Sequence, residues 1–126
     1  MIKQMTSHSN AIVWLDIPVS NLPRAISFYQ AVLNFDLVST QSNPDMATLM
    51  KQGSTSGLSL LSIPNVTPTP NAMLPYFNCE GRLEQAVSIA KLEGGKVLQA
   101  IHSMEPFGHR AVLQDVDGNR FAVHSS

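Results

Sequence analysis

The chain has little of what export, membrane insertion or nucleic-acid binding requires. Its one cysteine, Cys79, has no partner for an intrachain disulfide, which favours a reducing compartment. No apolar run approaches the roughly 20 residues of a membrane span, and residues 1–10 lack the apolar core of a signal peptide. No cluster of basic residues is present to follow a phosphate backbone. We therefore expect a cytoplasmic protein whose partners include neither membranes nor nucleic acids.

Charged residues are also scarce, at 13% of the 126 residues, with a formal net charge of -1. The hydrophobic share of 44% is sufficient for a folded domain, and this length suits one compact domain with a single core. A surface poor in charge is typical of a protein that covers part of itself with a second subunit. We therefore expect part of the surface to be covered by a second subunit.

Hydrophobic periodicity predicts a strand, a helix and three further strands in the first half of the chain. The helix has a capping residue, Ser20 or Asn21, just before it, and Pro23 lies in its first turn. The predicted elements are a strand at 11–18, a helix from 22 to about 34, and strands at 35–40, 46–52 and 57–63.

The same order of elements repeats after residues 64–72, which contain three prolines and are interpreted as a linker. A second helix ends at the pair Gly94-Gly95, and the pair Asp117-Gly118 favours a tight turn between the last two strands. The predicted elements are a strand at 73–79, a helix at 83–92, and strands at 96–101, 109–115 and 119–125.

The repetition extends to the residues themselves and indicates a tandem duplication. Leu22, Ala25, Ile26 and Ser27 recur 61 positions later, as Leu83, Ala86, Val87 and Ser88. We therefore expect one domain over 1–126, with module one at 10–63, the linker at 64–72 and module two at 73–125.

Two segments carry a resemblance to a known family. IPVSNLPRAISFYQAVLNFDL, at 17–37, resembles the opening of a vicinal oxygen chelate module, and DVDGNRFAVHS, at 115–125, resembles its closing strand. This superfamily includes glyoxalase I, ring-cleaving dioxygenases and bleomycin-resistance proteins. The resemblance implies an α+β fold in which two tandem βαβββ modules form a curved mixed sheet around a cleft, with the helices on the outer face. Because modules frequently pair across chains in this superfamily, the resemblance also implies a homodimer. It is much less specific for the reaction, because one fold supports many activities.

The resemblance also implies four positions at which relatives commonly bind a divalent metal. In this sequence they fall on Trp14, Leu74, Ala122, and either Ser59 or Leu61. Indole, isobutyl and methyl groups offer no lone pair suited to such a metal. We therefore expect no metal and no other cofactor.

Strand alternation gives a separate prediction of the cleft lining, since successive side chains point to opposite faces. The apolar residues of one face are expected to pack on the helices; they are Val13, Leu15, Ile17, Phe77, Phe121 and Val123. The alternate residues then line the cleft; they are Trp14, Asp16, Leu74, Tyr76, Asn78, Arg120, Ala122 and His124.

Among these, His124 and Asp16 are the candidates for acid–base chemistry. Imidazole titrates near neutrality, but His124 is equally interpreted as a hydrogen-bonded histidine at a strand end. Asp16 either orients His124, acts as a base itself, or holds Arg120 in an ion pair. The sequence alone does not decide between the two interpretations of His124 or among the three of Asp16.

Trp14 and Tyr76 either sandwich a flat apolar ligand or fill the space that a metal site occupies in relatives. The connection over 102–109, with His102, Glu105, Phe107 and His109, either closes over a ligand or forms a plain surface loop.

The favoured hypothesis is a glyoxalase-like protein that binds a small organic molecule in a metal-free cleft, either to sequester it or to convert it by acid–base chemistry. One alternative is a metal-dependent lyase, isomerase or dioxygenase whose ligands come from His8, Asp16, Glu105 or His124. Another is a dimeric interaction module whose pocket has collapsed.

Overall fold

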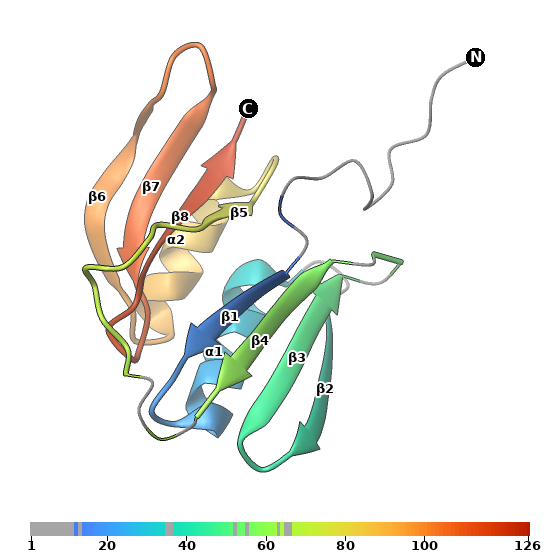
Figure 1. Ribbon diagram of the computed structural model, residues 1–126. Helices are drawn as coiled ribbons and strands as arrows, with labels where there is room; N and C mark the ends of the chain where they lie inside the picture. The colour runs from blue at the N-terminus through green and yellow to red at the C-terminus, as the bar shows by residue number, and fades with distance from the viewer. Residues whose placement is uncertain are drawn as a thin grey trace.

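The computed structural model describes residues 12, 14–34, 37–51, 53–54, 56–62, 64 and 67–126. Two copies of a strand–helix–three-strand unit follow one another, as predicted (Figure 1). The elements are β1 (Trp14–Pro18), α1 (Leu22–Leu33), β2 (Leu37–Asn43), β3 (Met46–Lys51), β4 (Gly57–Leu61), β5 (Tyr76–Asn78), α2 (Leu83–Leu92), β6 (Lys96–Ser103), β7 (His109–Gln114) and β8 (Arg120–Ser125).

Each module forms a four-stranded mixed sheet of the same topology. The strand orders are β1-β4-β3-β2 and β5-β8-β7-β6. The first strand of each module pairs in parallel with the last, and all other pairs are antiparallel. The expected α+β fold of two βαβββ modules is confirmed. The first strand of each module, β1 or β5, is an edge strand of its sheet.

Both helices pack on the same side of the sheets and against each other (Figure 1). The core between helices and sheets contains Ile17, Phe121 and Val123, with Leu15 and Phe77 partly buried against it. These residues are those that strand alternation assigned to the helical face. Val13, assigned to the same face, lies outside the described residues.

Local sequence signals determine where the helices begin and end. Asn21 is the N-cap of α1, where its side-chain oxygen accepts the Arg24 N–H at 3.1 Å, and Pro23 lies in the first turn. After α2 the chain turns through Gly94 at φ +98°, a conformation that favours glycine. Within the described part of the chain, neither helix has the length and apolar character needed to cross a lipid bilayer.

Two strands of the second module differ in length from their predictions. The strand expected at 73–79 is β5, which has only three residues, so Leu74 precedes it. Pro75 has no N–H to donate to a sheet, and only its carbonyl bonds β8, by accepting the Ala122 N–H at 2.8 Å. Conversely, β6 extends to Ser103. His102, expected in a loop, therefore lies on a strand.

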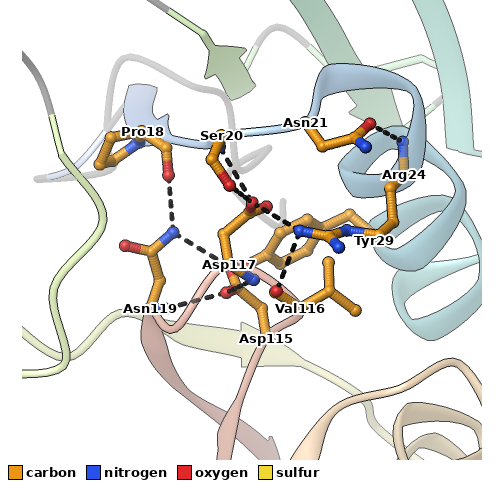
Figure 2. A network of polar contacts seen from close by, with 9 residues as sticks. All are labelled: Pro18, Ser20, Asn21, Arg24, Tyr29, Asp115, Val116, Asp117 and Asn119. Carbon is orange, nitrogen blue, oxygen red and sulfur yellow. Dashed lines mark hydrogen bonds and ion pairs between the residues drawn. The ribbon is translucent and has the colours of Figure 1, made fainter.

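The modules are joined by contacts between the β7–β8 turn and the start of α1 (Figure 2). Asp117 Oδ1 accepts the Ser20 N–H at 2.9 Å and forms an ion pair with Arg24 at 3.2 Å. The Tyr29 hydroxyl donates to Asp115 Oδ2 at 2.6 Å inside the core. The turn of one module thus fixes the strand-to-helix junction of the other.

Candidate functional site

A cavity of about 860 Å³ lies between the edge strands of the two sheets. Strand β1 contributes Trp14 and Asp16, and β5 contributes Tyr76 and Asn78. The chain that crosses from one module to the other adds Leu74, and the start of β8 adds Arg120. The cavity is therefore built by both modules and depends on how they are joined.

The backbone of the two edge strands also faces this cavity. The Val19 N–H donates to Leu61 O and the Cys79 N–H donates to His124 O, so odd-numbered residues bond the neighbouring strand of their own sheet. In a parallel pair, peptide groups of alternate residues point to opposite sides. The peptide groups of Trp14, Asp16 and Tyr76 therefore point away from their own sheets, towards the gap between the modules.

Six of the eight residues predicted to line the cleft line the cavity: Trp14, Asp16, Leu74, Tyr76, Asn78 and Arg120. The remaining two, Ala122 and His124, do not. Ala122 is fully buried directly opposite Tyr76 in the β5–β8 pair. The Tyr76 hydroxyl reaches Arg110 on β7, so the tyrosine side chain passes over β8 and covers Ala122.

The positions that the resemblance identifies with metal ligands carry side chains that do not suit a metal ion. Trp14 Nε1 donates to Ser59 Oγ at 3.0 Å, so these two first-module positions bond each other. Ala122 offers a buried methyl group and Leu74 an isobutyl group, neither of which can ligate. Across the described residues, no three His, Cys, Asp or Glu side chains lie close enough together to hold a metal ion.

A family model for the Glyoxalase/Bleomycin resistance protein/Dioxygenase superfamily matches residues 11–123. The chain belongs to this superfamily. The resemblance inferred from 17–37 and 115–125 is thereby confirmed. A search of curated proteins found no match.

Solved structures of the superfamily share the fold at low sequence identity. A glyoxalase/bleomycin resistance protein from Albidiferax ferrireducens T118 has a TM-score of 0.78 at 15% identity, covering 93% of this chain and 99% of that one. A family enzyme from Burkholderia phytofirmans PsJN has a TM-score of 0.72 at 17% identity, covering 89% and 95%. The fosfomycin resistance protein FosX from Listeria monocytogenes has a TM-score of 0.71 at 13% identity, covering 93% of each chain.

The strands that carry Asp16 and His124 are not neighbours, although a direct partnership of the two residues requires neighbouring strands. Asp16 lies on the edge strand of one sheet, whereas His124 lies on β8 of the other, separated from that edge by β5. His124 Nε2 instead bonds the Phe107 carbonyl at 2.5 Å, as a histidine at a strand end. Among the described residues, Asp16 forms no ion pair with Arg120 either.

Arg120 lines the cavity, and one of its N–H groups is buried beside it. Its Nε is buried and has no hydrogen-bond partner in the described part of the chain. A buried guanidinium N–H without an acceptor is costly, because it has lost water and gained no partner in exchange. Arg120 and the exposed carboxylate of Asp16 are thus separate polar groups at one cavity.

The sequence reasoning missed a polar cluster on the cleft-facing side of the second sheet. Arg110 Nε donates to His102 Nε2 at 3.0 Å, and Nη2 donates to Gln99 Oε1 at 3.3 Å. A third bond joins Nη1 to the Tyr76 hydroxyl. The alternation of side chains along β7 is the signal that could have found Arg110, because the next residue, Ala111, is apolar and faces the core.

Tyr29 lines the inner end of the cavity but is committed to the core. Burial, together with the adjacent Asp115 carboxylate, raises the pKa of Tyr29 well above its ordinary value. Its hydroxyl therefore remains protonated and bonded to Asp115. The inner wall of the cavity is structural, and the groups free to meet a ligand lie towards β1, β5 and Arg120.

Proposed function

We propose that this protein is a cytoplasmic glyoxalase-like homodimer that binds a small organic molecule in the cavity between its modules, without a metal. It either sequesters the molecule or converts it by acid–base chemistry. The observation that carries the proposal is the cavity itself. Its volume of about 860 Å³ falls within the roughly 300–1,000 Å³ usual for ligand pockets, and its lining combines aromatic and aliphatic walls with a few polar groups.

The residues of the cavity divide into walls and polar handles. Trp14, Tyr76 and Leu74 supply apolar surface against which a flat ligand packs. Asn78 and Arg120, which also line the cavity, orient its polar groups. Asp16 takes the role of general base, because it lies at the cavity, whereas the imidazole of His124 is bonded to Phe107 O.

The metal-free form of the proposal is supported by the donor set. The Ser59 hydroxyl is the single side-chain oxygen that Trp14, Ser59, Leu74 and Ala122 offer together, and it already accepts the indole N–H. Divalent metals in proteins need several carboxylate or imidazole ligands. Purified protein that retains one zinc, nickel, manganese or iron ion per chain would overturn this part.

Trp14 makes the proposal directly testable, because it is the only tryptophan of the chain and lies at the cavity, 39% exposed. Compounds from a panel of small aromatic molecules are expected to change its fluorescence and raise the melting temperature. Trp14→Ala removes the cavity wall and should abolish the thermal shift. Leu92→Ala, at an exposed position on α2, is the matched control and should retain it. Equal shifts in both variants, or none in the wild type, would contradict the proposal.

The homodimer is supported by apolar side chains on the edge strand β6, where Leu98 and Ile101 are 45% and 37% exposed. Light scattering of the purified protein tests it, since a dimer has twice the 13.7 kDa mass of one chain. A monomer at micromolar concentration would contradict this part and leave the cavity proposal intact.

A further inference from the structure

The polar cluster around Arg110 draws on three strands of the second sheet. Its members are Tyr76 on β5, Arg110 on β7, and Gln99 and His102 on β6. Arg110 is registered with His124 on one side and with His102 on the other. Side chains from adjacent strands therefore converge on one guanidinium.

Every partner of this guanidinium is electrically neutral. Arg110 can only donate, so His102 Nε2 must be an acceptor, and the ring proton lies on Nδ1, which bonds the Ala100 carbonyl at 2.8 Å. The Tyr76 hydroxyl and Gln99 Oε1 are the other acceptors. In the described part of the chain no carboxylate lies at ion-pair distance from Arg110. The cluster therefore orients a positive charge and leaves it without a counter-ion.

Donor groups remain for a further partner. A guanidinium has five N–H groups, and the three bonds to Tyr76, Gln99 and His102 use three of them. The planar fork is held with its central carbon 5.7 Å from the centre of the Tyr76 ring. Because the Tyr76 hydroxyl accepts from Arg110, its own hydrogen is available to donate. Arg110 and Tyr76 together present donors suited to a pair of anionic oxygens.

Tyr76 connects this charge to the cavity, because the same side chain lines the cavity and bonds Arg110. We propose that Arg110, positioned by His102 and Gln99, binds a carboxylate or phosphate group of the ligand, whose apolar body extends past Tyr76 into the cavity. The inference rests on the proposed function and narrows its ligand to small organic acids. Arg110 and the Tyr76 hydroxyl form the anion subsite, and the walls at Trp14 and Leu74 hold the remainder.

The test compares aromatic carboxylates with their neutral primary amides, which keep the shape and lose the charge. Binding to the full chain is followed by melting temperature and by Trp14 fluorescence. In the wild type at least one carboxylate should bind about tenfold or more tightly than its amide, the usual size of a charge-assisted bond. Arg110→Gln should remove this preference and leave amide binding unchanged. Arg110→Lys, which keeps the charge without the planar fork, should give an intermediate preference.

Lys91→Gln is the matched control, because it makes the same change in net charge at an exposed position on α2. It should bind the carboxylate as the wild type does. Equal affinity of acid and amide in the wild type, or an undiminished preference in a folded Arg110→Gln, would overturn the anion subsite while small-molecule binding stands. If neither acid nor amide shifts the melting temperature or the fluorescence, the proposed function fails together with the subsite.

Discussion

The two tyrosines of the chain place their hydroxyl groups in opposite surroundings. Tyr29 is fully buried and donates to Asp115 Oδ2 at 2.6 Å, whereas Tyr76 is 45% exposed at the cavity. In Tyr29→Phe the carboxylate keeps only the Asn119 Nδ2 contact at this oxygen, at 3.1 Å. We expect the free energy of unfolding to fall by about 2 kcal/mol, the cost of leaving a buried polar atom poorly satisfied. Urea denaturation measures it.

Tyr76→Phe is the control for this substitution, because it deletes the same atom from an exposed side chain. Its free energy of unfolding should stay within about 0.5 kcal/mol of the wild type. Equal urea midpoints for Tyr29→Phe and Tyr76→Phe would show that the bond to Asp115 contributes no net stability.

The fold lowers the reactivity of the Cys79 thiol. The thiol is fully buried, and burial raises its pKa, although the nearby Arg82 guanidinium opposes the shift. The thiolate is the reactive form, so both access and ionisation are reduced. We expect a disulfide reagent such as dithionitrobenzoate to modify the native protein slowly at pH 8 and the urea-unfolded protein rapidly. Complete labelling of the native protein at the unfolded rate would contradict this picture.

At the scale of elements, the start of α1 depends on one side chain. Asn21 Oδ1 accepts the Arg24 N–H at 3.1 Å and satisfies a backbone donor that the helix cannot. Asn21→Ala should lower the free energy of unfolding by about 1 kcal/mol, the usual contribution of an N-cap. Urea denaturation followed by far-ultraviolet circular dichroism measures the change. Asn71→Ala, at an exposed position in the crossover, should leave the midpoint unchanged, and a matching loss there would argue against a capping role.

The elements differ in how far the sequence predicts them, and the reason is physical. The bounds of α1 and α2 follow from hydrophobic periodicity together with two local signals, the Asn21 cap and the turn at Gly94. The sequence alone was therefore sufficient to predict both helices. Strand β5 is shorter than predicted, because an apolar run in the sequence does not show at which residue hydrogen bonding to the neighbouring strand ends. The contact of Tyr76 with Arg110 depends on the register of three strands, and register is a tertiary property.

The candidate site likewise combines features that the sequence predicts with features that depend on tertiary structure. Alternation identified the face that carries Trp14, Asp16 and Tyr76, because alternation is local to each strand. It could not show that His124, on the same face of β8, lies away from the cavity. That outcome depends on the loop that brings the Phe107 carbonyl to the imidazole, and on the relative placement of two sheets.

At the scale of the whole molecule, the cavity exists because two modules are held at a fixed separation. Asn119 contacts three segments that the sequence separates widely. Its Nδ2 donates to Pro18 O at 2.7 Å and to Asp115 Oδ2 at 3.1 Å (Figure 2). Its Oδ1 accepts the Thr69 N–H at 3.3 Å. One buried amide thereby ties the end of β1, the crossover and the β7–β8 turn together.

Asn119→Ala should therefore affect stability and the cavity at once. It leaves the Pro18 carbonyl and the Asp115 carboxylate short of a donor, and we expect the free energy of unfolding to fall by about 3 kcal/mol. Urea denaturation followed by Trp14 fluorescence measures the loss. Any ligand found by the fluorescence screen should also bind more weakly, because β1 and β5 are no longer held at one spacing. Asn119→Asp should be worse than alanine at neutral pH, since it places a second carboxylate beside Asp115. An Asn119→Ala protein that retains both its midpoint and its affinity would show that this amide does not hold the two modules together.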